Sequence, residues 1–172
     1  MENQLKSPNP SARQKALNKL RLDPYPELRE AIEGRLVRDT DVKARAMAAE
    51  ALGNLGSTES LDKLRLLARR DISWVVRKQA LAAIVKIEGP EAENLIRYAI
   101  ARDSSPQVRI EALQQAHRVL PGEKGAEVFL MGLKDQNEAV KLTAHRLLEN
   151  ATDKKIPPEH VRRWEKALEN SN

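Results

Sequence analysis

The sequence of 172 residues contains no cysteine, so disulfides, zinc–thiolate sites and thiol chemistry are excluded. Aromatic residues are also scarce, at two Trp, two Tyr and one Phe. The formal net charge of +5, whose excess lies in residues 1–102, could attract nucleic acid or an acidic protein. Because nucleic-acid-binding surfaces usually interleave aromatic and basic side chains, the scarcity of aromatics makes an acidic protein the better candidate.

Long apolar runs are missing as well. No stretch approaches the roughly 18 apolar residues that a membrane-spanning helix needs, and the segment from Met1 to Lys6 has no apolar core of signal-peptide length. These absences predict a soluble, cytoplasmic protein without a membrane partner. No segment shows the alternation of apolar and polar residues that is typical of a strand, so we expect no sheet.

Motifs for catalysis are absent too. The sequence has no glycine-rich phosphate loop, no His-Glu-x-x-His and no Gly-x-Ser-x-Gly. The three histidines, His117, His145 and His160, have no spacing typical of a metal site. We therefore predict a protein that is not an enzyme, with no catalytic residue, no bound metal and no cofactor.

What the sequence does contain is a pattern with a period of 32 residues and an unbroken register. Five basic residues mark it, each followed three residues later by an alanine, and an aspartate stands six residues before the last four. The basic residues are Arg13, Arg45, Arg77, Arg109 and Lys141, the alanines are Ala16, Ala48, Ala80, Ala112 and Ala144, and the aspartates are Asp39, Asp71, Asp103 and Asp135. A fixed period in this range is typical of a solenoid.

Each period reads as two helices. In residues 39–70, the first half opens with the capping residue Asp39 and ends at Gly56, and the second half opens with Ser and Thr before Glu and has apolar residues at helical spacing. The predicted fold class is all-α, an α-solenoid in which about five helix pairs form a superhelical stack. We expect one domain over residues 1–172, with repeats starting near 7, 39, 71, 103 and 135 and a C-terminal capping helix at about 157–169.

Two columns of the repeat predict its core. The basic helix of each copy has an apolar stripe four residues apart, and the alanine in its centre lets two helices approach closely. The other helix supplies the matching column Ile32, Leu64, Ile96 and Val128, with His160 in the last copy.

The run Asp-x-x-x-x-Val-Arg-x-x-Ala, most complete from Asp103 to Ala112, resembles the HEAT repeat in the short form named after phycobilisome lyases. The resemblance covers roughly residues 7–167. It implies a structural ladder of hydrogen bonds between neighbouring repeats, with Asp39 paired with Arg45, Asp71 with Arg77, Asp103 with Arg109, and Asp135 with Lys141. Lys141 would lack the planar fork of an arginine.

The resemblance also implies that the helix with the Val-Arg motif lines a concave face. Its outward positions differ from copy to copy, as expected of a binding surface. We predict that this face binds a protein segment, acidic and with an apolar anchor, through Lys78, Ala82, Lys86, Ile110, Gln114, Arg118, Leu142 and Arg146. Basic residues there surround the apolar Ile110 and Leu142, an arrangement seen at binding hot spots.

Three further features have two interpretations each. Trp74, expected in a turn, is either a partner anchor or a plug between repeats. Phe129, Leu133 and Val161 form either an exposed convex patch or a surface that the C-terminal cap covers. The basic residues Lys6, Arg38, Arg70, Arg102, Lys134 and Lys166 recur before each capping position, and they either bind phosphates or, as their recurrence favours, stabilise helix C-termini.

The favoured function is a protein-interaction scaffold or adaptor. Two alternatives follow from the resemblance: a subunit of a bilin-lyase-like or chaperone complex acting on a chromophore protein, and a HEAT-like nucleic-acid-binding protein. The partner's identity and the oligomeric state stay open at this point.

Overall fold

The computed structural model describes residues 1–152 and 154–169, and within them it contains helices and turns but no strand. The all-α fold class is therefore confirmed. The α-helices are α1 (Glu2–Leu5), α2 (Pro10–Leu22), α3 (Arg29–Arg38), α4 (Val42–Leu55), α5 (Leu61–Arg70), α6 (Trp74–Glu88), α7 (Glu93–Arg102), α8 (Pro106–Val119), α9 (Gly122–Leu133), α10 (Glu138–Thr152) and α11 (Val161–Glu169). Short 3₁₀ turns precede three of them, at Pro26–Leu28, Thr58–Ser60 and Gly89–Ala92.

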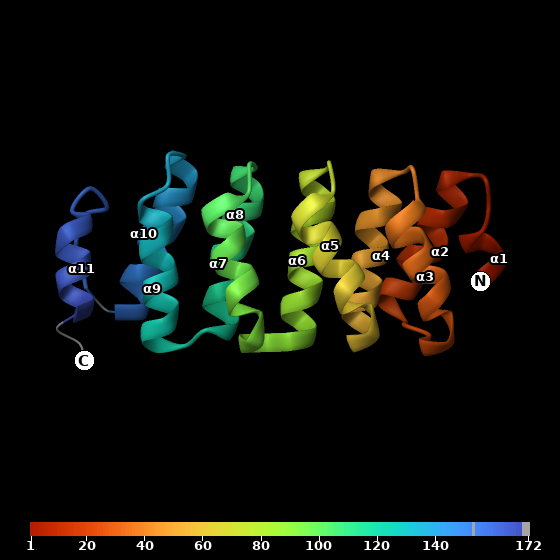
Figure 1. Ribbon diagram of the computed structural model, residues 1–172, viewed down its shortest axis with the longest axis horizontal. Helices are drawn as coiled ribbons and strands as arrows, with labels where there is room; N and C mark the ends of the chain where they lie inside the picture. The colour runs from red at the N-terminus through yellow and green to blue at the C-terminus, as the bar shows by residue number, and fades with distance from the viewer. Residues whose placement is uncertain (153, 170–172) are drawn as a thin grey trace. The chain divides into compact units, whose positions relative to one another are not determined.

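The helices fall into two compact units, residues 1–89 and 90–172. In unit 1, α3 packs on α4 and α5 packs on α6, while α2, α4 and α6 lie side by side (Figure 1). In unit 2, α7 packs on α8 and α9 packs on α10, and α8 lies against α10. Each unit is thus built of helix pairs, but each pair joins the second helix of one 32-residue copy to the first helix of the next, and not the two helices of one copy as expected. The single domain expected over residues 1–172 stays a prediction.

The turn between paired helices is built by two polar residues, not one. We expected Asp39 to cap the helix with the Val-Arg motif, but Asp39 ends α3, and the Asp41 carboxylate accepts the Ala44 N–H at 2.7 Å and caps α4. Asp39 Oδ1 instead accepts the N–H of Asp41 at 3.0 Å, which closes the turn. The capping prediction was therefore wrong by two residues, because the aspartate of the repeat is used to hold the loop.

The same turn recurs in the later copies. Asp71, Asp103 and Asp135 each accept the backbone N–H of the residue two positions further on, at 2.8–2.9 Å. A short carboxylate that bonds the backbone two residues ahead fixes a tight turn. The aspartate column thus positions the start of each Val-Arg helix.

The core has the close helix approach that the alanine column predicts. Ala48, Ala80, Ala112 and Ala144 are all fully buried. Gly53 of α4 brings the backbones still closer, because a methyl group added there would lie 2.8 Å from Cα and Cβ of Ala83 in α6. In unit 2, a methyl group on Gly132 of α9 would lie 2.7 Å from Cβ of Ala144 in α10. Neighbouring helices therefore touch through their smallest residues.

The C-terminal helix α11 covers what could have been an exposed patch. Phe129 and Leu133 of α9 are buried, and α11 packs against α9. The structure therefore confirms the interpretation in which the C-terminal cap covers this surface. The sequence alignment assigned His160 to the core column, but His160 is exposed and Trp164, one turn later, is fully buried. The last repeat thus shifts its core contact by one helical turn.

Trp74 lies at the first position of α6 and not in the preceding turn, where we had placed it. The helix begins there because Ser73 adopts the extended conformation of an N-cap residue and Val76 N–H donates to the Ser73 carbonyl. Trp74 is 41% exposed, and Lys78 Nζ lies 5.9 Å from the centre of its ring. This geometry is a cation–π contact within one helix.

Candidate functional site

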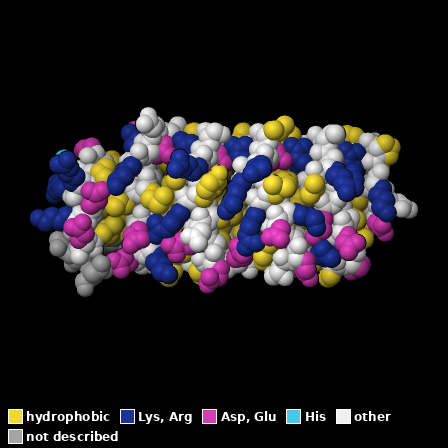
Figure 2. Space-filling model, viewed as in Figure 1, with side chains coloured by type: hydrophobic (Ala, Val, Ile, Leu, Met, Phe, Trp, Pro, Cys, Tyr) yellow, Lys and Arg dark blue, Asp and Glu magenta, His cyan; other side chains and the backbone are white. Residues whose placement is uncertain are grey.

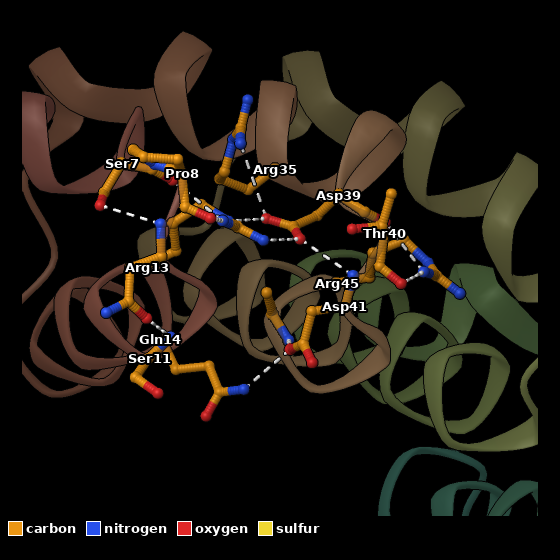
Figure 3. A network of polar contacts seen from close by, with 12 residues as sticks. Ser7, Pro8, Ser11, Arg13, Gln14, Arg35, Asp39, Thr40, Asp41 and Arg45 are labelled. Carbon is orange, nitrogen blue, oxygen red and sulfur yellow. Dashed lines mark hydrogen bonds and ion pairs between the residues drawn. The ribbon is translucent and has the colours of Figure 1, made fainter.

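The polar feature that recurs in both units is a ladder of arginine–aspartate pairs. In the first rung, Arg13 Nε donates to Asp39 Oδ2 at 2.6 Å and Nη2 donates to Oδ1 at 2.7 Å, so that the guanidinium grips both oxygens (Figure 3). The third nitrogen, Nη1, donates to the carbonyls of Ser7 and Pro8, each at 2.9 Å. One arginine therefore joins two successive loops.

The same rung recurs in both units. Arg45 grips Asp71 at 2.8 and 2.9 Å, and Arg109 grips Asp135 at 2.6 and 2.9 Å. In each rung the aspartate follows its arginine by 26 residues and belongs to the next repeat. Bidentate charge-assisted pairs of this kind are among the strongest hydrogen bonds in proteins.

This register corrects the predicted pairing. Arg45 and Asp39, Arg77 and Asp71, and Arg109 and Asp103 do meet, but each arginine donates to the backbone carbonyl of its aspartate, at 2.8–2.9 Å. The reason is geometric: the carboxylate points toward the helix of the preceding repeat, while its carbonyl points toward the helix that follows in the chain. Arg13, which had not been counted among the ladder residues, makes the first rung, and its spacing of 26 residues from Asp39 was the available signal.

The ladder ends at Lys141. Its Nζ lies 2.7 Å from Glu138 Oε2, in an exposed pair, instead of reaching Asp135. The position 26 residues further on, where the next aspartate would stand, is Ala167. The column thus has a lysine at the position whose partner 26 residues ahead is not a carboxylate, so that a bidentate arginine is not needed there.

Burial and pairing oppose each other at the rung carboxylates. Burial would raise the pKa of Asp39, but hydrogen bonds from Arg13 and from the Asp41 N–H outweigh it and hold the pKa below its ordinary value. The pKa of Asp135 is lowered in the same way, by Arg109 and the Asn137 N–H acting against burial. Both aspartates are ionised and neutralised by their arginines, which makes them structural groups.

A second polar cluster, which the sequence analysis missed, surrounds the buried Glu33 of α3. Its carboxylate accepts hydrogen bonds from Arg29 at 2.8 Å, Ser60 at 2.7 Å and Lys63 at 2.5 Å. Burial would raise the pKa of Glu33, yet these three donors lower it. The cluster ties α3 to the start of α5. Since Glu33 stands in a column that is charged in the first three copies, its periodicity alone did not distinguish it from a surface residue.

The predicted partner-binding residues divide between the units. Unit 1 carries Lys78, Ala82 and Lys86, all on α6. Lys86 Nζ donates to Asn54 Oδ1 at 2.8 Å, and Asn54 in turn donates to the carbonyl of Arg21 at 2.6 Å. With Lys78 held over Trp74, this part of the predicted face is already occupied by contacts inside the unit.

Unit 2 carries the other five residues on two adjacent helices. Ile110, Gln114 and Arg118 belong to α8, and Leu142 and Arg146 belong to α10. Leu142 is 53% exposed and Ile110, at the equivalent position one period earlier, is half-buried. Arg118 donates to Gln115 at 3.1 Å, whereas Arg146 is exposed and makes no ion pair with any residue that the structure describes. This pair of helices therefore offers an apolar residue beside an unused cation.

The described parts of the chain contain no assembled metal site. No group of three or more His, Asp or Glu side chains comes together there in a way that could hold a metal ion. His145 is hydrogen-bonded through Nε2 to the carbonyl of Ile156 at 2.8 Å and lies edge-on to Trp164, so its role is to hold the C-terminal segment. None of the helices in residues 1–152 and 154–169 is both long and apolar enough to cross a membrane.

Comparison with known proteins supports the repeat assignment. Residues 1–85 match the model of the family described as HEAT repeats. A search of curated proteins found no match. HEAT repeats generally serve as protein-interaction scaffolds. The helix pairs of unit 1, the arginine–aspartate rungs between its repeats and the family match agree, and together they support HEAT repeats over residues 1–85.

Proposed function

We propose that the protein is a non-catalytic interaction scaffold, and that the face of α8 and α10 in unit 2 binds a partner protein. The observation that carries the proposal is Leu142, an apolar residue more than half exposed on a helix whose other outward residue, Arg146, has no ion pair among the described residues. The HEAT-repeat match supports the general role, since this family is typically non-enzymatic and binds proteins.

The chemistry of this face favours an acidic segment with one apolar anchor. Leu142 and the half-buried Ile110 would pack on the anchor and exclude water, which is the common property of binding hot spots. Arg118 and Arg146 would attract carboxylates and mainly accelerate association. The bilin-lyase-like and nucleic-acid-binding alternatives stay predictions from the sequence.

The test is a double substitution, Ile110→Glu with Leu142→Glu, in the full chain used as bait for affinity capture from the source cell. We expect the proteins captured by the parent chain to be lost, with a drop in recovery of more than about tenfold, because two charges replace the apolar anchor site. Far-UV circular dichroism and the melting temperature should stay close to those of the parent, since both side chains point away from the core.

The matched control is Leu22→Glu. Leu22 is also an exposed leucine, 72% accessible, but it ends α2 in unit 1. This variant should capture the same proteins as the parent. Equal capture by the double variant would show that the partner binds elsewhere, and loss of capture by Leu22→Glu as well would show that the effect is nonspecific.

A further inference from the structure

We infer that unit 1 has a second binding site, distinct from the α8–α10 face: a groove between α3 and α5 that takes a short acidic peptide through one apolar side chain. The groove lies between the rungs at Asp39 and Asp71 and has a volume of about 430 Å³. Its walls come from the C-terminal ends of α3 and α5 and from the loop before α6. It is named here the rung groove.

Three apolar side chains of the rung groove are exposed to solvent. Val37 is 45% accessible, Leu66 is 50% and Ile72 is 93%, while Leu67 beneath them is only 6% accessible. Scattered exposed apolar residues are ordinary, but these line one hollow together. The rung groove therefore offers an apolar contact area with a buried floor.

The charges around the rung groove are unbalanced. Asp39 and Asp71 line it, but their carboxylates are already gripped by Arg13 and Arg45. Arg38 and Arg70 also line it, at the C-termini of α3 and α5; both are exposed, and neither makes an ion pair with a described residue. Two unused guanidinium groups beside neutralised carboxylates attract anionic groups.

The corresponding groove of unit 2, about 450 Å³, shows that this surface is not required by the ladder. Ala101 and Gln136 replace Val37 and Ile72, and Lys134 replaces Arg70. Lys134 is moreover paired with Glu165 at 2.7 Å. The repeat thus forms its rungs without an apolar rim, and of the cations that line this groove only Arg102 is exposed and without an ion pair among the described residues. Hydrophobic side chains do lie next to Lys and Arg side chains elsewhere on the visible face of the molecule (Figure 2), and the rung groove differs in having both around one hollow.

Charge complementarity selects the occupant. Carboxylates of an extended peptide can form bidentate pairs with Arg38 and Arg70, and an aliphatic or aromatic side chain between them can cover Val37, Leu66 and Ile72. The dimensions suit one such side chain with its flanking backbone. The helix C-terminal ends repel carboxylates weakly, but the two arginines project from these ends and offset that field.

The test uses short random peptides displayed on phage, selected on the full-length chain and counter-selected on the Ile72→Glu variant. Enriched sequences should combine several Asp or Glu residues with one large apolar residue. A synthetic peptide of the enriched sequence should shift the methyl NMR signals of Val37, Leu66 and Ile72. Its affinity should fall roughly tenfold in Arg70→Glu and in Ile72→Glu, but stay unchanged in Leu142→Glu, which alters only the α8–α10 face.

Four outcomes would overturn the inference. These are enrichment of basic or uncharged peptides, methyl shifts confined to other residues, retention of binding by both variants, and failure to enrich any peptide over the counter-selection. Sedimentation equilibrium of the free chain addresses the other occupants. A dimer that Ile72→Glu dissociates would assign the rung groove to a second copy, and flotation with anionic vesicles that depends on Ile72 would assign it to a membrane surface.

Discussion

At the scale of the residue, each ladder arginine holds two loops at once. Nε and Nη2 of Arg109 bind the carboxylate of Asp135 in the next loop, and Nη1 binds the carbonyl of Asp103 in its own loop. A lysine has one nitrogen and no planar fork, so it cannot make these contacts together. The planar arrangement of the guanidinium donors is therefore as important for the rung as the positive charge.

We predict that Arg109→Ala destabilises the protein by about 1–3 kcal/mol, because it leaves the largely buried Asp135 carboxylate without its charged partner. Lys141→Ala is the matched control from the same column and the same unit. Its exposed pair with Glu138 should contribute less than about 0.5 kcal/mol. Urea unfolding followed by circular dichroism measures both, and equal losses would contradict a special role for the rung.

The residue columns were readable from the sequence, but their pairing was not. The spacing of 32 residues identified the arginines and the aspartates, yet a column says nothing about whether a side chain reaches its own loop or the next. That choice depends on where the turn points the two acceptors of Asp39. Its carboxylate meets Arg13 of the preceding repeat, and its carbonyl meets Arg45 of the helix that follows. Glu33 was missed for a related reason, since its donors Ser60 and Lys63 come from a different helix pair.

At the scale of the element, glycine and alanine residues determine how closely neighbouring helices pack. Gly53 faces Ala83 across the contact of α4 and α6, with no room for another methyl group. Gly34, inside α3, has no atom within 4 Å of the position that a methyl group would take. The two glycines therefore differ in their surroundings and allow a direct comparison.

We predict that Gly53→Ala destabilises unit 1 by about 1–3 kcal/mol, because overpacking forces α4 and α6 apart. Gly34→Ala should instead stabilise by about 0.5–1 kcal/mol, since alanine is the better helix former and nothing obstructs it. Thermal and urea unfolding measure both changes. A stabilising Gly53→Ala would mean that the helices separate at little cost.

Helix boundaries were predicted less well than helix existence. Trp74 was assigned to a turn, yet its equivalents include Pro10 and Pro106, and proline is favoured at the first position of a helix. The three residues share that position, as α2, α6 and α8 begin at them. The placement of Trp164 in the core could not follow from the period, because α11 departs from the register of the earlier copies by one helical turn.

At the scale of the whole molecule, buried carboxylates make stability depend on pH. The folded protein lowers the pKa of Glu33, Asp39 and Asp135, so it binds fewer protons than the unfolded chain near their ordinary values. Their stabilisation is complete above about pH 5 and is lost as the pH falls through about 4 and below. Acid should therefore unfold the protein.

We predict that Asp39→Asn reduces this acid sensitivity. The variant should be less stable than the parent at neutral pH, where the charged rung is lost, and the difference should shrink below about pH 4, where the carboxylate of the parent becomes protonated. Urea unfolding at a series of pH values measures the difference. A gap between parent and variant that stays constant down to pH 2 would show that Asp39 contributes through packing and not through its charge.

Each rung joins an arginine to an aspartate that comes later in the sequence, and this order affects which insertions and deletions of whole repeats the chain can tolerate. Because Arg13, Arg45 and Arg109 each meet the aspartate 26 residues ahead, removal of residues 39–70 as one block would bring Arg13 into register with Asp71. Duplication of the same block would likewise supply every new arginine with a carboxylate. Lys141 is exempt from this rule, since Ala167 stands 26 residues ahead of it. A gene encoding this chain could thus change its length by whole periods and still encode a protein whose internal polar groups are matched.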